Sequence, residues 1–535
     1  MGLRHGLLAS FSVVALAASA GAQTLPRSPA SGTPASGGSA SSPSVSASGT
    51  AGARSATRPV KLAQASAAPS PRPATAPPTA SRTAVAGSGQ NLPHTLTEAL
   101  AATYSNQPAL QAERAKLRAT DENVPTALAG WRPTVVLAGS TGYGDGMSRA
   151  YTSTLRTYTN VQTDRLLGTA QATVTQNIYT GGKTQANVNH SKNQVMAERA
   201  TLIAQEQTSF NNAVGAYVGV IQAKQLLALQ VNNEQVLAKQ LQATNDRFRV
   251  GEITRTDVAQ AEAALEGARA TRETAVGNLQ TARGTFQQIV GVFPPDDLIE
   301  PQPLALPVRS EQEAADFASS NNPTVITAMF NDAAAKDAID VAFAALLPQV
   351  SVQGQTFQQN NTGGRSSSTN GYQVVAQLSV PLYQGGAEYS AVRQARQSQQ
   401  QTQRLIDDAK RTAVQSAVQA WDTLVAAKAS ADSTRAQIRA NEVALEGVER
   451  EAIVGSRTTL DVLNATQLLL QSRTTLVQNL SQVITASYAV AVAIGRLTAR
   501  DMHLPVPLYD ETAYYQAVKD RWVGLADYAT SQPGR

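Results

Sequence analysis

The sequence contains no cysteine and few aromatic residues. Without cysteine, a disulfide scaffold, a thiolate metal site and a lipid-modified N-terminal cysteine are not expected. Aromatic residues make up 5% of the chain, which is low for the compact core of an enzyme. The four histidines, His5, His94, His190 and His503, form no ligand-like pair. We therefore predict no metal site and no cofactor.

Acidic residues are missing from the first 92 positions, which carry seven lysines and arginines. The rest of the chain contains the other 37 of the 44 basic residues and all 39 acidic residues. Its net charge is therefore −2, although the net charge of the whole chain is +5. A nucleic-acid interface needs a concentrated basic surface. We therefore expect no nucleic-acid partner.

Catalytic motifs are missing as well. The sequence has no Gly-x-Ser-x-Gly elbow, no His-Glu-x-x-His zinc motif and no Gly-rich phosphate loop ending in Gly-Lys. We therefore predict that the protein is not an enzyme.

Long apolar runs are rare. A mostly apolar run at 7–18 follows Arg4, with Ala20 and Ala22 at plausible cleavage positions, which predicts a signal peptide at 1–22. The alternative, a membrane anchor, is disfavoured because a spanning helix needs about 20 apolar residues. No later segment has 18 consecutive apolar residues, so we expect no membrane-spanning helix and any role in a membrane must use strands.

The next segment, 23–92, is dominated by alanine, serine, proline, glycine and threonine. This composition has too little apolar surface to offset the entropy of ordering, and it predicts a disordered linker. We expect the folded region at 93–500, followed by a tail at 501–535 whose role the sequence does not indicate.

The folded region contains two similar halves. Matching residues are first 215 positions apart and later 204 apart, which places an 11-residue length difference between two predicted strands. A constant offset over many residues predicts a duplication, with repeat one at 93–291 and repeat two at 313–495. The matching pairs include Pro108 and Pro323, Pro133 and Pro348, Tyr179 and Tyr383, Gly251 and Gly455, Asp257 and Asp461, and Gly291 and Gly495.

Each half predicts two strands joined by a polar loop. In repeat two, Val350 and Val352 alternate with Gln349 and Ser351. This alternation predicts a sheet with one apolar and one wet face. The predicted strands are 134–143, 169–179, 349–357 and 372–383, and the predicted loops are 144–166 and 358–371.

Each half also predicts one very long helix, at 183–250 and 387–454, about 100 Å in length at 1.5 Å per residue. Apolar residues recur every seven positions in the second of these, which predicts coiled-coil packing. That column is Ala417, Leu424, Ala431, Ile438, Leu445 and Ala452. The shorter predicted helices, which could pair antiparallel with the long ones, are 95–131, 254–291, 313–346 and 458–495.

Special residues mark the junctions between strands and helices. Glycine pairs would let the backbone turn from sheet into helix without steric hindrance, and prolines would set the bend. Aromatic residues near strand ends are typical of interfacial girdles in membrane barrels, and ordinary packing is the alternative explanation. The glycines are Gly181, Gly182, Gly385 and Gly386, the prolines Pro133, Pro348 and Pro381, and the aromatic residues Trp131, Tyr143, Tyr179, Tyr372 and Tyr383.

The number and length of the predicted strands indicate that several copies of the chain form one barrel. Strands of about ten residues suit a tilted crossing of a bilayer, but four strands cannot close a barrel, and open edges do not occur in lipid. Two copies would give 8 strands and a filled lumen, whereas three give 12 and match a wide helical tube. We predict an α+β membrane protein, a homotrimer with a 12-stranded β-barrel continued by an α-helical coiled-coil tunnel. The alternative is a soluble periplasmic coiled-coil or adaptor protein without a pore.

Over about 93–500, the sequence resembles the TolC family of bacterial outer-membrane export channels. The resemblance rests on the strand-to-helix junctions IYTGG and LYQGG and on the helix-to-helix turns RVGEITRTDV and IVGSRTTLDVLNATQ. It also rests on the sequence AIG that ends the last predicted helix. It implies a trimeric barrel in the Gram-negative outer membrane, in contact with its lipid, and a periplasmic helical tunnel. It also implies export of drugs or proteins with an inner-membrane transporter and a periplasmic adaptor protein. The absence of cysteine slightly favours the secretion-type branch.

The resemblance further implies a tunnel that is closed at its periplasmic tip. Arg457 and Asp461 match the family's closing turn, whereas Ala452 and Asn464 replace a tyrosine and a second aspartate. Asp257 matches the acidic residue of the first turn and is a possible partner for Arg457.

The tip residues also have a purely structural explanation. Gly251 and Gly455 suit the left-handed conformation that ends a helix. Asp257 and Asp461 each follow a threonine by three residues, the position at which a carboxylate caps a helix. Capping and gating are both compatible with the sequence.

Overall fold

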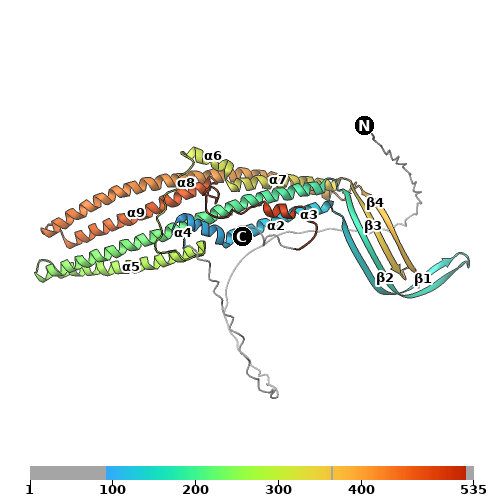
Figure 1. Ribbon diagram of the computed structural model, residues 1–535, viewed down its shortest axis with the longest axis horizontal. Coiled ribbons are helices and arrows are strands. Elements are labelled where there is room, and N and C mark those ends of the chain that lie inside the picture. The colour runs from blue at the N-terminus through green and yellow to red at the C-terminus, as the bar shows by residue number, and fades with distance from the viewer. Residues whose placement is uncertain (1–91, 363–365, 526–535) are drawn as a thin grey trace, which may run out of the picture. The chain divides into compact units, whose positions relative to one another are not determined.

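The structure describes residues 92–362 and 366–525, which form two long helical hairpins, a four-stranded sheet and several shorter helices (Figure 1). The coordinates are a computed structural model, and these residues belong to one of two compact units, Ala86–Arg535. The predicted signal peptide at 1–22 and almost all of the predicted linker at 23–92 lie outside the described residues.

The sheet has a strand at each of the four predicted places. All neighbouring strands are antiparallel, in the order β1-β2-β3-β4. Within the described residues, β1 pairs only with β2 and β4 only with β3, so the sheet has two edges. The strands are β1 (Thr134–Thr152), β2 (Thr157–Tyr179), β3 (Gln349–Asn360) and β4 (Ser368–Ser379).

The predicted polar loops were too long. Most of 144–166 is paired strand, so the β1–β2 hairpin extends beyond β3 and β4. Cross-strand contacts outweigh the weak strand propensity of the glycines and serines in this hairpin. For example, the Tyr151 and Tyr158 rings pack edge-on, with 5.2 Å between their centroids. The predicted loop at 358–371 is likewise partly strand. The 11-residue difference between the repeats is therefore mainly a longer hairpin.

The fourth strand ends earlier than predicted. We predicted a strand over 372–383, whereas β4 begins at Ser368 and ends at Ser379. Pro381 follows two residues later, and a proline has no N–H to donate to a strand ladder. Pro381 and Tyr383 therefore lie in the connection to the next helix.

The long helices are α4 (Lys183–Arg249) and α8 (Ala387–Ile453), with 67 residues each. Helix α5 (Arg255–Val290) returns along the tip half of α4, and α9 (Thr459–Ala493) returns along α8 (Figure 1). The predicted seven-residue column of α8 is buried or half-buried at all six positions, so it faces neighbouring helices as expected.

The predicted helices 95–131 and 313–346 are broken at Pro108 and Pro323, and the first has a second break at Glu122. Proline begins a helix readily because the first N–H of a helix has no partner in any case, and the residue before it is extended. The pieces are α1 (Leu96–Asn106), α2 (Pro108–Asp121) and α3 (Asn123–Leu128) in repeat one, and α6 (Glu311–Asn321) and α7 (Pro323–Phe343) in repeat two. The 3-10 turns η1 (Ala129–Trp131) and η2 (Ala344–Leu346) lead into β1 and β3.

Two helices are more apolar than expected. By length and composition alone, α4 and α9 could cross a membrane, with a mean hydropathy of 1.2 over 18 residues. Their apolar residues also pack inside the chain, for example Phe210 and Tyr217 of α4 and Val490 of α9. Packing within the chain buries 33% of this window in α4 and 39% in α9.

The largest apolar core lies where α1, α2 and the ends of α5 and α9 meet the middle of α4. The Tyr217 hydroxyl lies 2.8 Å from the carbonyl oxygen of His94 and 2.7 Å from that of Ile299, and it can donate to either. Leu504 of the predicted tail is buried in the same core. The chain then follows the helical body through α10 (Ala513–Val518), which packs on α2.

Candidate functional site

The two faces of the sheet differ in polarity. Residues that are directly opposite in neighbouring strands share a face, and the register groups apolar side chains on one side and threonine and glutamine on the other. The apolar face includes Val135, Leu137, Ala172, Val174, Val350, Val352, Tyr372, Val374, Ala376 and Leu378. The opposite face includes Thr173, Thr175, Gln353, Gln355, Gln373 and Gln377.

The apolar face is also exposed in the single chain. Leu137 is 82% exposed and Val374 is 73% exposed, far more than a sheet packed on a core allows. A sheet of this kind suits a wall between lipid and water, with the threonine and glutamine face toward the water.

The junctions between sheet and helices use glycines in a conformation that other residues avoid. Gly181 and Gly182 have φ of +65° and +83°, and their counterparts Gly385 and Gly386 have +71° and +84°. Gly181 also packs closely, because a Cβ there would lie 2.8 Å from the Ala344 carbonyl oxygen. Gly385 has open space at the same place.

Prolines and aromatic residues lie near these junctions. Pro133 and Pro348 directly precede β1 and β3. All five aromatic residues predicted near strand ends are exposed in the single chain: Trp131 by 39%, Tyr143 by 70%, Tyr179 by 45%, Tyr372 by 85% and Tyr383 by 77%. Their place in a girdle stays a prediction.

At the opposite end of the helices, the two tip turns are nearly identical. Gly251 and Gly455 both have φ of +82° and end α4 and α8. Asp257 accepts hydrogen bonds from the Thr254 N–H at 3.0 Å and its hydroxyl at 2.7 Å. Asp461 accepts the same bonds from Thr458, at 3.0 Å and 2.8 Å.

These capping bonds set the charge of both carboxylates. The pKa of Asp257 is lowered mainly by the Thr254 hydroxyl, and that of Asp461 mainly by the Thr458 backbone N–H. Both residues therefore remain negatively charged at neutral pH.

The remaining gate candidates lie beside the second turn. Arg457 forms an ion pair with Glu451, 2.8 Å between Nε and Oε2. Among the ion pairs of the described residues, none joins Arg457 to Asp257. Asn464 is exposed and lies three residues after Asp461, so the two side chains share a helix face.

Apolar side chains surround these polar groups. Val250 is 72% exposed at the first turn, and Ile453 and Val454 are 80% and 79% exposed at the second. Exposed apolar residues grouped at both tips are typical of a contact surface.

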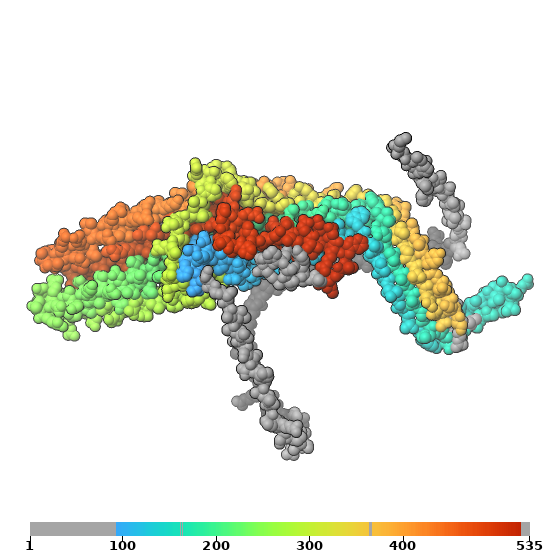
Figure 2. Space-filling model, viewed as in Figure 1, coloured from blue at the N-terminus to red at the C-terminus, as the bar shows by residue number. Residues whose placement is uncertain are grey.

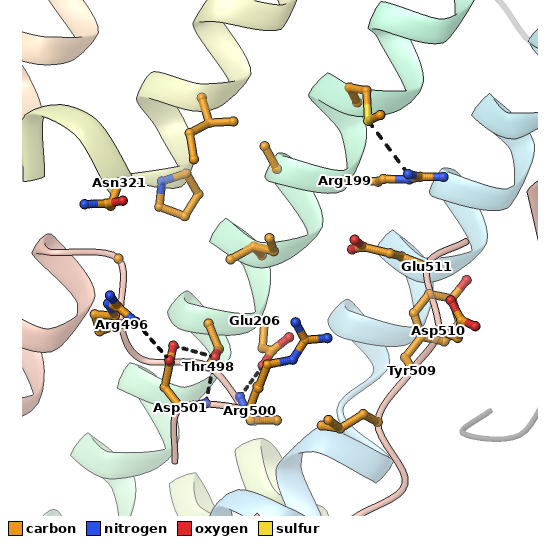
Figure 3. Close-up of a pocket in the computed structure, with 18 of the residues that line it drawn as sticks. Arg199, Glu206, Asn321, Arg496, Thr498, Arg500, Asp501, Tyr509, Asp510 and Glu511 are labelled. Carbon is orange, nitrogen blue, oxygen red and sulfur yellow. Dashed lines mark hydrogen bonds and ion pairs between the residues drawn. The ribbon is translucent and has the colours of Figure 1, made fainter. Parts of the chain in front are cut away.

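A groove of about 880 Å³ lies farther up the helical body, between α4, the start of α7 and the C-terminal segment (Figure 3). Its floor is apolar, with Ile203 and Phe330, and charged residues such as Arg500 and Glu511 line its rim. Glu206 accepts a hydrogen bond from the Ala499 N–H at 2.5 Å, and burial raises the pKa of Glu206. This bond fastens the turn after α9 to α4.

A buried carboxylate lies under the same C-terminal segment. Asp121 of α2 has no exposed surface, and neither of its carboxylate oxygens has a hydrogen-bond partner. Burial raises the pKa of Asp121 to about 7, and the nearby charge of Arg199 only partly opposes this. Nothing in the sequence pattern singled out this residue.

The packing of the predicted tail was also missed by sequence reasoning. The backbone N–H of Tyr509 donates to the Tyr104 hydroxyl at 2.9 Å, and the Tyr514 hydroxyl donates to Glu122 at 2.9 Å. The alternation of Leu504, Val506 and Leu508 with prolines and a tyrosine was a usable signal for a packed segment.

Among the residues that the structure describes, no group of three or more histidines, aspartates or glutamates could hold a metal ion. The features that remain are a two-faced sheet, long helices and two equivalent tips.

Known proteins with the same pattern are channels. The family model described as outer membrane efflux protein matches residues 99–292 and 315–496, once in each predicted repeat. The outer membrane efflux protein BepC of Brucella suis is 35% identical over 438 residues, covering 81% of this chain and 92% of BepC. The outer membrane protein TolC of Escherichia coli is 25% identical over 318 residues, covering 56% of this chain and 63% of TolC.

Solved structures agree on the fold. The crystal structure of the outer membrane protein VceC from Vibrio cholerae superposes with a TM-score of 0.64 at 20% identity, covering 75% of this chain and 96% of VceC. The predicted fold, a barrel sheet continued by a helical tunnel, is therefore confirmed. The match to the family in both repeats, together with this fold, shows that the chain belongs to the outer membrane efflux protein family and is an export channel of the outer membrane.

Proposed function

We propose that three copies of the chain close the sheet into one 12-stranded barrel and the helices into one periplasmic tunnel. This homotrimer would pass cargo from an inner-membrane transporter, joined by a periplasmic adaptor protein, to the exterior. The alternative of a pore-free periplasmic protein finds no support in the family relationship.

The observation that carries this proposal is the open sheet. β1 and β4 have free edges in the described residues, while the face that they share with β2 and β3 is apolar and exposed. Unpaired strand edges are not tolerated in lipid, because each unsatisfied backbone group costs several kcal/mol there. Pairing β4 of one copy with β1 of the next removes every edge.

The junctions support the same pairing. Inside one chain, Gly181 after β2 packs against η2, which precedes the neighbouring strand β3. By the repeat, Gly385 after β4 should pack against the equivalent turn, η1, of the next copy. The open space at Gly385 is where that turn would lie.

The tips support docking and closure. Exposed Val250, Ile453 and Val454 provide apolar contact area for an adaptor protein. The charged Asp257, Arg457 and Asp461, with Asn464 beside them, would be repeated around the tunnel axis in a trimer. We propose that they restrict the aperture, in addition to capping their helices.

The cargo is the least determined part of the proposal. The name of BepC refers to efflux, which favours small molecules, whereas the absence of cysteine slightly favours the secretion-type branch. A conduit takes much of its specificity from its pump, so co-purification of the transporter with the channel would decide between drugs and proteins.

The test of the assembly uses the full chain, purified from outer membranes in detergent. We expect a species of three chains that resists SDS until it is heated, and discrete conductance steps in a planar lipid bilayer. A chain that is monomeric and soluble without detergent would contradict the proposal. A stable trimer without conductance would leave the fold intact but contradict the channel.

A further inference from the structure

The C-terminal segment returns to the level at which the chain enters the sheet. Arg132 lies two residues before β1, and its Nη1 donates a hydrogen bond to the Arg521 carbonyl oxygen at 2.7 Å. The Arg132 guanidinium also lies 4.9 Å from the centre of the Trp522 ring. Figure 2 shows the red C-terminal segment extending along the helical body toward the sheet. Trp522 is therefore held close to the base of the barrel wall.

The end of this segment is an ordered turn. The Arg521 Nε donates to the Val523 carbonyl oxygen at 3.3 Å. Gly524 has φ of +112°, and a Cβ there would lie 2.7 Å from Arg521 Nη2. Glycine suits this position because the backbone conformation is unfavourable for L-residues.

The turn exposes apolar side chains that a soluble surface would avoid. Trp522 is 65% exposed, Val523 is 85% exposed and Leu525 is fully exposed. Three exposed apolar residues within four positions of a turn indicate a partner surface.

The surroundings indicate what the partner is. The apolar face of the sheet begins with Val135, three residues after Arg132, so the turn lies close to the start of the surface that is expected to contact lipid. Arg132, Lys519 and Arg521 outnumber the acidic Asp520, which gives a net charge of +2. Tryptophan beside arginine and lysine is typical of the membrane interface, where the ring lies at the headgroups and the cations meet phosphate.

We propose that the turn at 519–525 docks on phospholipids of the periplasmic leaflet of the outer membrane. Trp522, Val523 and Leu525 enter the interface, and the three cations meet the lipid phosphates. This gives each chain a lipid contact in addition to its strands. The inference uses the outer-membrane location of the channel and the position of β1, and it does not depend on the number of copies.

The test uses tryptophan fluorescence, since the chain has only Trp131, Trp421 and Trp522. In the full chain with Trp131→Phe and Trp421→Phe, Trp522 is the only emitter. The channel is reconstituted in phospholipid vesicles, with and without bromine on the acyl chains near the headgroup. For a ring in the interface, we expect roughly half of the emission to be lost in brominated vesicles and little quenching by aqueous acrylamide.

A matched control keeps Trp421 as the only emitter, with Trp131→Phe and Trp522→Phe. Trp421 packs against the apolar cluster between α8 and α9, and brominated lipid should leave its emission unchanged. Adding Arg132→Ala to the chain with Trp522 alone removes the stacked guanidinium and should reduce its quenching by lipid.

The remaining outcomes overturn the inference. Equal emission in both kinds of vesicle with strong acrylamide quenching would place Trp522 in water. Protection from both quenchers would mean that protein, such as a neighbouring copy, covers the turn. The conductance of each preparation is measured alongside, so that loss of the channel is distinguished from loss of the lipid contact.

Discussion

Helices α4 and α8 are equivalent in the two repeats and have the same length, yet they differ in burial. Twenty residues of α4 are buried, whereas only eight residues of α8 are. α4 contacts α5, α7 and α9 and also α1, α2 and α3, while α8 contacts only α6, α7 and α9 to a comparable extent within the described residues. One chain therefore provides more neighbours for its first long helix and leaves more of the second exposed.

The junction glycines repeat this difference on a smaller scale. Gly181 is enclosed by η2 of its own chain, and Gly385 faces open space. The two positions have similar sequence and similar φ, so only the neighbour differs. The comparison teaches that the junction of repeat one is filled from within the chain, whereas the matching place in repeat two is open, as the proposed assembly of several copies requires.

The largest expected effect comes from changing these glycines to alanine. Gly181→Ala should prevent folding of the single chain, because its Cβ would meet the Ala344 carbonyl oxygen and Leu347 Cβ, both at 2.8 Å. Gly385→Ala should allow the chain to fold and reduce trimer formation. The measurement is the yield of folded chain and of heat-sensitive trimer on SDS gels.

Gly182→Ala and Gly386→Ala are the matched controls. Both have a positive φ and open space, so each should cost only the backbone strain of about 1–2 kcal/mol. If Gly385→Ala impairs the folding of the single chain as severely as Gly181→Ala, the difference between the repeats does not arise from a missing neighbour.

A smaller effect is expected from two buried aspartates, one in each repeat. Asp121 has no hydrogen-bond partner, and burial raises its pKa from 3.8 to about 7. The folded chain therefore holds a proton that the unfolded chain releases, and stability falls as the pH rises from about 4 to about 7. Asp121→Asn should remove this slope and stabilise the protein by a few kcal/mol at pH 8, with little difference near pH 4.

Asp332 of repeat two is the natural control. Burial opposes its charge, but Lys336, at 2.6 Å, and hydrogen bonds from Gln399 and Thr402 together lower its pKa. Lys336 occupies the position equivalent to Asp121. Asp332→Asn should therefore destabilise the protein at pH 7, by about 1–3 kcal/mol in thermal unfolding. A gain in stability for both variants would mean that burial alone determines the effect of each carboxylate on stability, and that the hydrogen bonds and ion pair of Asp332 do not.

The smallest effect on stability is expected at the tips, where the two repeats are most alike. Asp257→Ala and Asp461→Ala each remove the carboxylate of a capping box and should lower the midpoint of thermal unfolding only slightly. If Asp461 also narrows the aperture, Asp461→Ala should raise single-channel conductance or the entry of vancomycin. Thr458→Ala weakens the same cap but keeps the carboxylate, so its conductance should stay at the wild-type value.

Two results would contradict the gate proposal. Unchanged conductance of Asp461→Ala in an intact trimer would mean that Asp461 only caps its helix. Equal increases in conductance for Asp461→Ala and Thr458→Ala would mean that fraying of the start of α9, and not loss of the carboxylate, widens the aperture.

The sequence predicted the parts of the fold that depend on local patterns. Alternation around Val350 and Val352 predicted a two-faced sheet, and the seven-residue column of α8 predicted its packed side. Prediction from the sequence failed where contacts between residues far apart in the chain determine the structure. The strand pairing within 144–166 depends on cross-strand contacts such as Tyr151 with Tyr158, which local propensity does not record.

The candidate sites divide in the same way. The caps at Asp257 and Asp461 involve residues three apart, so the sequence contained both partners. The burial of Asp121 and the contact of Arg132 with Trp522 join residues far apart in the chain, and no short motif marks them.

By itself, the sequence determined the duplication, the long helices, the two faces of the sheet and the turns at the tips. These depend on periodicity, on glycine and proline, and on caps within one helical turn. Only the tertiary structure decided in which of the two repeats each element is enclosed by neighbours. It also decided that the C-terminal segment packs on the helical body and that Trp522 lies beside the start of β1. Those features depend on which surfaces meet, and two equivalent sequences such as Gly181 and Gly385 acquire different surroundings because their neighbours differ.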